Sequence, residues 1–254
     1  MSEKDIGTVF AQVVGGLGNQ LFIISTAIAY SNKYGKTLYC FLNPNETRQN
    51  HFGLPIGFPN AKIDHTYNEP CFSYKEIPYV NGNIMLNGYF QSSKYFPDKK
   101  IVNSITIPKS KDFSFPLIPD GKIPVCVHIR RGDYIDSSDF HIVPGNDYYS
   151  EAIKLMRMNV PNSHFLIFSD DIEYVKNNQI GDITKSEMTI VDQCDIDCIN
   201  IMKECKFFII ANSTFSWWGA VLGGNKLVFA PKTWFGRVGP QDWQDIYEPD
   251  WIVI

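Results

Sequence analysis

Short apolar segments alternate with longer segments of helical periodicity throughout the second half of this 254-residue chain. The expected strands are Val125–Ile129, His164–Phe168, Met188–Val191, Phe207–Ile210 and Lys226–Phe229. The expected helices are Asp147–Met158, a short helix from Asp171, Asp195–Cys205 and Phe215–Leu222. Such alternation predicts a parallel, doubly wound sheet. Ligands bind beyond the carboxyl ends of its strands, so chemistry is expected in the loops that follow them.

The first half opens with a strand, a turn and a helix. The expected elements are strand Thr8–Val14, turn Gly15–Gly18, helix Asn19–Tyr34 ending at Gly35, and strands Thr37–Leu42 and Ile84–Phe90. The region between these last two strands lacks periodicity to about Gly82, and we expect it to be irregular. Prolines punctuate residues 107–124, which is typical of a stiff connection between domains. We therefore expect domains at 1–115 and 116–254.

Charge and hydropathy exclude several classes of partner. A net charge of −4 leaves no basic surplus for binding a phosphate backbone, so we expect no nucleic acid partner. The first residues do not form a signal peptide, and no run reaches the roughly 18 apolar residues of a membrane span. We expect no transmembrane segment and a protein that is cytoplasmic or peripheral to a membrane.

Six cysteines could form disulfides or bind a metal. The absence of an export signal favours reduced thiols. Cys194, Cys198 and Cys205 lie close together, but no Cys-x-x-Cys pair or histidine accompanies them. We therefore expect buried free thiols and no metal site.

The glycine-rich turn Gly15–Gln20 follows a strand and opens a helix. Leu21 stands where a dinucleotide fingerprint needs its last glycine, which disfavours a Rossmann oxidoreductase. A glycine turn can be purely structural. The amides of Asn19 and Gln20, placed at a helix N-terminus, also favour contact with an anionic or hydroxyl-rich ligand.

A second motif, His128–Tyr134, ends a buried strand. Alternation puts His128 and Arg130 on one face of the strand and Arg131 on the other. Adjacent arginines that leave a buried strand need anions, and their planar guanidinium groups suit phosphate. The alternative is a structural network in which Asp133 satisfies both arginines.

Two further motifs follow strands. In Ser169-Asp170-Asp171 the acids either cap the next helix or accept hydrogen bonds from a guanine edge, and a divalent metal is a third reading. The segment that begins Asn212-Ser213-Thr214 offers an amide and hydroxyls at a helix start, where pyrophosphate oxygens can bind. The tandem Trp217-Trp218 is more typical of core packing than of ligand stacking.

Together GGLGNQLF, HIRRGDY, FSDDIEYVK and ANSTFSWWGA resemble the motif series of the α-1,2-fucosyltransferases, family 11 of the glycosyltransferases. The resemblance extends from about Val13 to Pro231. It implies an α/β fold of GT-B type, with two facing Rossmann-like lobes built on parallel sheets. Residues 116–254 would bind the GDP-sugar, and residues 1–115 would form the acceptor side. Tyr174 departs from the tryptophan of many relatives, and the membrane anchor of animal relatives is absent, which leaves the acceptor open.

The resemblance also implies the reaction: inverting, metal-independent transfer of L-fucose from GDP-β-L-fucose to a sugar hydroxyl, commonly the 2-hydroxyl of galactose. GDP-fucose and a glycan acceptor are the expected partners, and no cofactor is expected. By position, His128 and Arg130 match the family's donor-binding pair, with Arg130 on the β-phosphate. Asp170 or Asp171 would hold guanine, and Ser213 with Thr214 the pyrophosphate. The other expected donor contacts are Gly16, Gly18, Asn19, Gln20, Ser169, Asn212 and Ser216.

Without a metal, side chains must neutralise the charge that develops on the GDP leaving group. Arg130 is expected to do so with support from Arg131. Asp133 is a candidate catalytic residue, and its reading as an arginine partner stays open. Two other functions also stay open: a transferase of another GDP-6-deoxyhexose or GDP-hexose, and a non-catalytic protein that binds nucleotide sugars or glycans.

Overall fold

The computed structural model describes residues 7–45 and 49–254, which divide into two compact units. The first contains the chain up to Pro108 together with Asp242–Ile246, and the second contains Lys109–Gln241 with Tyr247–Ile254. The sequence placed the boundary between residues 115 and 116. The division between Pro108 and Lys109 lies earlier because the next segment already binds the second unit: the Ser110 N–H donates to the Asp197 carboxylate at 2.9 Å.

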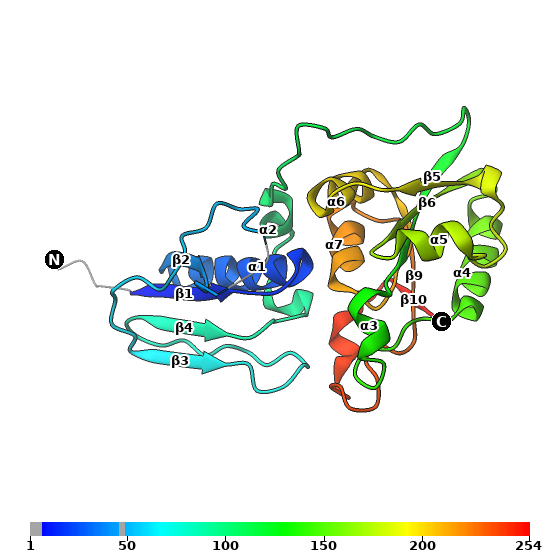
Figure 1. Ribbon diagram of the computed structural model, residues 1–254. Helices are drawn as coiled ribbons and strands as arrows, with labels where there is room; N and C mark the ends of the chain where they lie inside the picture. The colour runs from blue at the N-terminus through cyan, green and yellow to red at the C-terminus, as the bar shows by residue number, and fades with distance from the viewer. Residues whose placement is uncertain (1–6, 46–48) are drawn as a thin grey trace. The chain divides into compact units, whose positions relative to one another are not determined.

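Within the described residues, the first unit has a parallel four-stranded sheet in the order β2-β1-β4-β3. Its strands are β1 (Thr8–Val13), β2 (Thr37–Leu42), β3 (His65–Asn68) and β4 (Ile84–Asn87). Helix α1 (Leu17–Tyr34) connects β1 to β2 and lies along the sheet, and the short helices η1 (Ser93–Tyr95) and α2 (Lys99–Ser104) follow β4 (Figure 1). Gly35 ends α1 at a φ of 65°, as its position after the last periodic residue predicts.

Two strands of the first unit differ from expectation. β3 lies in the region expected to be irregular, because its mostly exposed side chains leave no apolar alternation to detect. β4 ends at Asn87, before the expected Phe90, because the chain turns sharply and Phe90 takes a φ of 53°. The Glu69 carboxylate holds this turn by accepting the N–H groups of Tyr89 and Phe90 at 2.8 and 3.0 Å.

The second unit, as far as it is described, has a parallel six-stranded sheet in the order β10-β9-β8-β5-β6-β7. Its strands are β5 (Ile123–Ile129), β6 (Ser163–Ser169), β7 (Met188–Val191), β8 (Phe207–Ile209), β9 (Leu227–Ala230) and β10 (Ile252–Val253). Its helices are α3 (Gly132–Asp136), α4 (Asn146–Asn159), α5 (Ile172–Asn177), η2 (Lys185–Glu187), α6 (Asp195–Glu204) and α7 (Thr214–Leu222). The short helix η3 (Trp243–Ile246) belongs to the first unit. Helices α4 and α5 lie on one face of the sheet and α6 and α7 on the other (Figure 1). The predicted doubly wound parallel sheet is confirmed.

Alternation along β5 divides the core of the second unit into two layers. Val125, Val127 and Ile129 pack in the layer that contains α4 and α5. His128 points to the other layer, where its ring contacts α7. On that side Trp217 and Trp218 are fully buried with ring centroids 5.0 Å apart, so the core-packing reading of this pair is confirmed.

The six cysteines are all free thiols, but the expectation that they are buried is wrong for Cys194, which is exposed near the start of α6. Burial raises the pKa of the Cys198 and Cys205 thiols to about 12, so neither ionises near neutral pH.

Among residues 7–45 and 49–254, no helix has the length and apolar content that crossing a bilayer requires.

Candidate functional site

Three loops of the second unit meet at one edge of its sheet. β5 lies between β6 and β8, and all three strands are parallel, so their carboxyl ends lie together. The chain proceeds from β5 outward to β6 and β7, and then returns to β8 on the opposite side of β5. Such a reversal creates a topological switch point, where doubly wound sheets bind ligands. Residues from all the second-unit motifs lie in these loops.

Arg130 is the centre of the contacts at this edge. Its Nη2 donates to Asp133 Oδ1 at 2.6 Å, and its Nη1 lies 2.9 Å from Asp170 Oδ2. The guanidinium also lies over the Tyr134 ring, 5.0 Å from its centroid. Its buried Nε has no hydrogen-bond partner in the described part of the chain. The group is therefore fixed in position but keeps one donor unused.

Arg131 points in a different direction from Arg130, as alternation predicts. Its Nε donates to Asp171 Oδ2 at 3.2 Å, and its guanidinium stacks on the Tyr174 ring 3.5 Å from the centroid. Tyr174 belongs to α5, which packs on the same face as Ile129. Tyr174 therefore provides an aromatic surface for Arg131.

Asp170 joins the loop after β6 to the loop after β5. Its Oδ1 accepts the Arg131 backbone N–H at 2.9 Å, while its Oδ2 pairs with Arg130. Gly132 makes this approach possible, because a Cβ there would lie 2.4 Å from Asp170 Oδ2. The glycine is thus required for close approach of the carboxylate.

Asp171 and Ser169 organise the start of α5. Asp171 is the N-cap residue, and its Oδ1 accepts the Tyr174 N–H at 2.9 Å. Ser169 Oγ accepts the Asp171 N–H at 3.0 Å. Both contacts are those of the helix-cap reading that the sequence left open.

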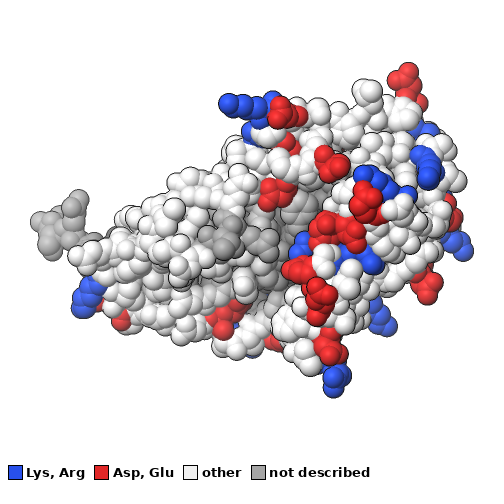
Figure 2. All heavy atoms as spheres, viewed as in Figure 1, with Lys and Arg blue, Asp and Glu red and all other residues white. Residues whose placement is uncertain are grey.

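We call Arg130, Arg131, Asp133, Asp170 and Asp171 the arginine–aspartate cluster. It contains two positive and three negative side chains, each engaged with another member. Figure 2 shows acidic and basic side chains intermixed on the visible face of the second unit. Asp133 is the most exposed of the paired groups, with 59% of its side chain accessible. In the described part of the chain it pairs with Arg130 and not with Arg131, so it does not satisfy both arginines.

His128 is buried beside the cluster and is neutral. Its Nδ1 lies 2.8 Å from Ser216 Oγ, and its ring centroid is 5.6 Å from that of Phe215. Burial, with the nearby Arg130 charge as a second cause, lowers the pKa of His128 to about 3. The imidazole can therefore donate or accept a hydrogen bond at neutral pH but carries no charge.

Asn212 connects three loops. Its side-chain Nδ2 donates to the backbone carbonyls of Ile142 and Trp234, both at 2.7 Å. Its backbone carbonyl accepts a hydrogen bond from the Tyr134 hydroxyl at 3.1 Å. Its Oδ1 is buried without a partner among the described residues. These contacts make Asn212 a residue that shapes the site, whatever else it binds.

The hydroxyls after Asn212 lie at the start of α7. Ser213 is the N-cap, and its Oγ accepts the Phe215 N–H at 3.3 Å. Thr214 is the first helical residue and is half-buried. Because no acidic residue lies in the first turn, the positive end of this helix dipole has no side-chain anion of its own.

The glycine-rich turn belongs to the first unit. Gly15 has a φ of 77°, Gly16 is the N-cap of α1, and Gly18 is buried within the first helical turn. Gln20 Nε2 donates back to the Gly15 carbonyl at 2.9 Å, and Asn19 Oδ1 accepts from Gln91 at 3.0 Å. Both amides therefore support the turn, which is the structural reading of this motif.

Three aromatic residues near the cluster were not among the site residues predicted from the sequence. Tyr134 and His141 stack with centroids 4.1 Å apart, and Phe235 packs at 5.9 Å from His141. Burial raises the pKa of Tyr134 to about 12. Tyr134 was visible as the last residue of the second motif, but His141 and Phe235 reach the site through irregular segments that carry no periodic signal.

Comparison with known proteins supplies independent findings. The family model of Glycosyl transferase family 11 matches residues 66–254. The chain is 28% identical to an α-1,2-colitosyltransferase of Escherichia coli, covering 90% of this chain and 93% of that protein. It is 26% identical to a putative galactoside 2-α-L-fucosyltransferase of Caenorhabditis elegans, covering 84% of this chain and 68% of that protein.

Solved structures agree in fold. The crystal structure of the fucosyltransferase NodZ from Bradyrhizobium matches with a TM-score of 0.53 at 12% identity, covering 85% of this chain and 93% of that chain. A NodZ α-1,6-fucosyltransferase crystal soaked with GDP-fucose matches with a TM-score of 0.51 at 12% identity, covering 85% of this chain and 92% of that chain. The α/β fold is therefore of the expected GT-B type.

The Asp171 cap generates a stability prediction. Asp171→Ala should lower the free energy of unfolding by about 0.5–2 kcal/mol, because the Tyr174 N–H loses its acceptor. Asp171→Asn keeps a capping oxygen and loses only a partly exposed ion pair, so it should cost less. Equilibrium unfolding of both variants in guanidinium chloride measures the difference between their free energies of unfolding. Equal losses would assign the stabilisation to the ion pair with Arg131.

His128 generates a pH prediction. Its pKa is about 3 in the folded chain and about 6.5 when unfolded, so the unfolded state alone gains a proton as the pH falls below about 6.5. The stability that neutral His128 provides is therefore present above pH 6.5 and lost on acidification. Relative to His128→Asn, the wild type should lose about 2–3 kcal/mol of unfolding free energy between pH 7 and pH 4.5. Parallel pH profiles for the two proteins would contradict the assignment.

Proposed function

Because this chain belongs to glycosyl transferase family 11, we propose that it transfers L-fucose from GDP-β-L-fucose to the 2-hydroxyl of a galactoside. The transfer inverts the anomeric configuration and needs no metal. The observation that carries the proposal is the Arg130 guanidinium, which is fixed at the switch point of the sheet beside a second arginine and a helix N-terminus. The NodZ crystal soaked with GDP-fucose and the galactoside fucosyltransferase relative support the choice of substrates.

In this proposal Arg130 neutralises the charge that develops on the β-phosphate as the glycosidic bond breaks. A planar guanidinium presents several donors to phosphate oxygens, and one of them, Nε, has no partner in the described residues. Arg131 supports it from the other side of the loop, and stacking of its guanidinium on the Tyr174 ring limits its motion. The N–H groups at the start of α7, with Ser213 and Thr214, add fixed dipoles that favour the pyrophosphate.

The cluster has more carboxylates than arginines, and this imposes a condition on donor binding. A pyrophosphate that entered with all three aspartates in place would face net negative charge. Asp133 holds Arg130 from the exposed side, so it is the carboxylate most easily displaced. We infer that the β-phosphate takes its place on Arg130 Nη2, while Asp170 keeps the guanidinium oriented. Asp133 then also becomes available to accept the acceptor proton.

Guanine recognition is assigned to the aspartates after β6. Both oxygens of Asp170 and of Asp171 already accept hydrogen bonds or ion pairs, yet each carboxylate has roughly four lone-pair sites. Asp170 is the better candidate, because Asp171 is needed as the cap. His128 and Ser216 form a neutral hydrogen-bonded pair beside this region.

In the first unit, Gly16 leaves open space beside its backbone for a ligand, since a Cβ there would meet no described atom within 4 Å.

A second donor is favoured by one observation. The match to the α-1,2-colitosyltransferase of Escherichia coli covers 93% of that protein. Colitose is the sugar that corresponds to fucose without its 3-hydroxyl. The proposed pyrophosphate and guanine contacts do not distinguish the two sugars. GDP-colitose is therefore the alternative donor for the same site and linkage.

The proposal is tested by incubating the protein with GDP-fucose or GDP-colitose and a panel of β-galactosides in EDTA. We expect GDP release that depends on the galactoside, with an α-1,2-fucosylated product identified by NMR. Transfer from GDP-colitose alone would select the alternative donor. Loss of activity in EDTA with recovery on adding Mn²⁺ or Mg²⁺ would refute metal independence, and absence of transfer with either donor would refute the proposed function.

Arg130 gives the sharpest mutational prediction. Arg130→Ala should lower kcat by at least about a hundredfold with a smaller effect on GDP affinity, because the group acts mainly in the transition state. Arg130→Lys keeps the charge but loses the planar fork, so it should remain impaired. Arg157→Ala is the matched control, since Arg157 pairs with Asp182 and Glu187 elsewhere in the same unit.

Melting curves must first establish that each variant folds. Normal turnover by Arg130→Ala together with inactive Arg131→Ala would transfer the leaving-group role to Arg131.

The Asp133→Asn variant separates the two proposed roles of that carboxylate. If the β-phosphate displaces Asp133 from Arg130, the variant should bind GDP more tightly. If Asp133 is an obligatory base, the variant should lose kcat at unchanged GDP affinity.

A further inference from the structure

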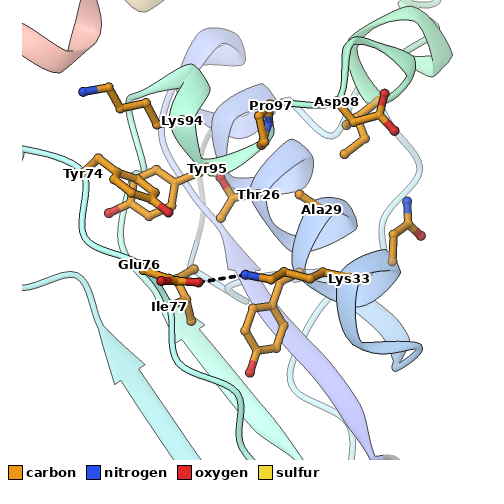
Figure 3. A pocket seen from close by; sticks show the side chains of 13 residues that line it. Thr26, Ala29, Lys33, Tyr74, Glu76, Ile77, Lys94, Tyr95, Pro97 and Asp98 are labelled. Carbon is orange, nitrogen blue, oxygen red and sulfur yellow. Dashed lines mark hydrogen bonds and ion pairs between the residues drawn. The ribbon is translucent and has the colours of Figure 1, made fainter.

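The first unit contains a pocket of about 440 Å³ that the proposed chemistry does not use. Its walls come from α1 and from the segments around Tyr74–Ile77 and Lys94–Ile101 (Figure 3). The volume lies in the range of about 300–1,000 Å³ that small-molecule sites occupy. Every described lining residue belongs to the first unit, so the pocket exists independently of the arginine–aspartate cluster.

Tyrosine rings form much of the pocket wall and are held in place. Tyr74 and Tyr95 pack edge to face with centroids 4.8 Å apart. The Tyr95 hydroxyl accepts the Lys75 N–H at 3.2 Å, and the Tyr30 hydroxyl donates to the Pro78 carbonyl at 2.8 Å. Because the Tyr30 and Tyr95 hydroxyls are hydrogen-bonded to the backbone, and Tyr74 packs on Tyr95, the rings offer preformed apolar surfaces to a ligand.

The two lysines and two acids that line the pocket balance one another in charge. Lys33 pairs with Glu76 at 2.8 Å across one side, drawn as a dashed line in Figure 3. Lys94 pairs with Asp245, and Asp98 caps α2 by accepting the Lys100 N–H at 2.9 Å. The described lining therefore offers no excess charge of either sign, which favours an uncharged ligand over a phosphate, nucleotide or acidic sugar.

One buried polar group in the wall lacks a partner. Thr26 lines the pocket and is 1% exposed, and its Oγ1 has no hydrogen-bond partner within the described residues. Leaving a buried hydroxyl unpaired costs free energy, which a ligand hydroxyl could recover. Figure 3 shows Thr26 among the tyrosines on the α1 side of the pocket.

We propose that this pocket binds a neutral oligosaccharide. Pyranose rings combine apolar C–H faces, which pack on fixed tyrosine rings, with hydroxyls that can pair with Thr26 and with the Lys33–Glu76 pair. The proposal rests on the proposed function in one respect, the choice of a glycan ending in β-galactose as the probe. The glycan can be the distal part of the acceptor or a glycan that is not a substrate, and the two arms of the test distinguish these sources.

The first arm measures binding without transfer, by calorimetry or NMR titration of the full chain with lactose and with a neutral tetrasaccharide ending in β-galactose. Thr26→Val keeps the shape but removes the hydroxyl, and should weaken tetrasaccharide binding roughly three- to tenfold. Its melting temperature should be unchanged or raised, because an unpaired hydroxyl is removed. Ala29→Trp should abolish binding by filling the pocket.

Ser25→Ala is the matched control. Its hydroxyl is also buried without a described partner, but Ser25 is not among the residues that line the pocket. The Ser25→Ala variant should bind the tetrasaccharide with an affinity within about twofold of wild type, because the hydroxyl that it loses makes no hydrogen bond to the ligand. Wild-type affinity in folded Thr26→Val and Ala29→Trp would overturn the proposal, as would equal losses in Thr26→Val and Ser25→Ala.

The second arm measures transfer. If the pocket holds the distal part of the acceptor, Ala29→Trp raises KM for the tetrasaccharide and leaves KM for methyl β-galactoside unchanged. If KM is unchanged for both acceptors while binding is lost, the pocket holds a non-substrate glycan. A wild type that binds the tetrasaccharide but transfers nothing would refute the proposed function and leave this inference standing.

Discussion

Two adjacent arginines leave a buried strand at one edge of the second sheet, and the chain has to supply anions for both. β6 ends beside β5 and provides Asp170 and Asp171, while α3 provides Asp133. The absence of a side chain at Gly132 lets Asp170 approach closely. The cap of α5, the stacking of Arg131 on Tyr174 and the path of the loop after β5 all follow from satisfying these guanidinium groups.

The same network constrains the proposed donor binding. Three carboxylates against two guanidinium groups hold the arginines in place but leave no surplus positive charge, so in the proposed reaction an anionic donor has to compete for them. Asp133 is the most exposed carboxylate of the cluster, and the proposal therefore makes it the one that the donor displaces. His128 adds no charge, because burial keeps it neutral, and this confines the positive charge to the two arginines.

The first unit has a different electrostatic character. Its glycine turn and the sharp turn at Phe90 are held by internal amide and carboxylate contacts, and its pocket is surrounded by charges that pair with one another. A region of this kind suits a ligand recognised by ring surfaces and hydroxyls. The contrast with the arginine–aspartate cluster supports the proposals that place an anionic nucleotide sugar on the second unit and a neutral glycan on the first.

Sequence periodicity alone predicts the second sheet and the two faces of β5, because periods of two and 3.6 residues depend only on neighbouring positions. Those periods predicted that His128 and Arg131 lie on opposite faces of the strand, and they predicted that the three motifs lie at one edge of the sheet. The sequence could not reveal β3, whose polar residues lack alternation, or choose between Asp170 and Asp171 as the cap. It also could not show that Asn212 clamps loops or that Thr26 lines a pocket beside Tyr74 and Tyr95. These depend on contacts between residues far apart in the chain, which only the tertiary structure brings together.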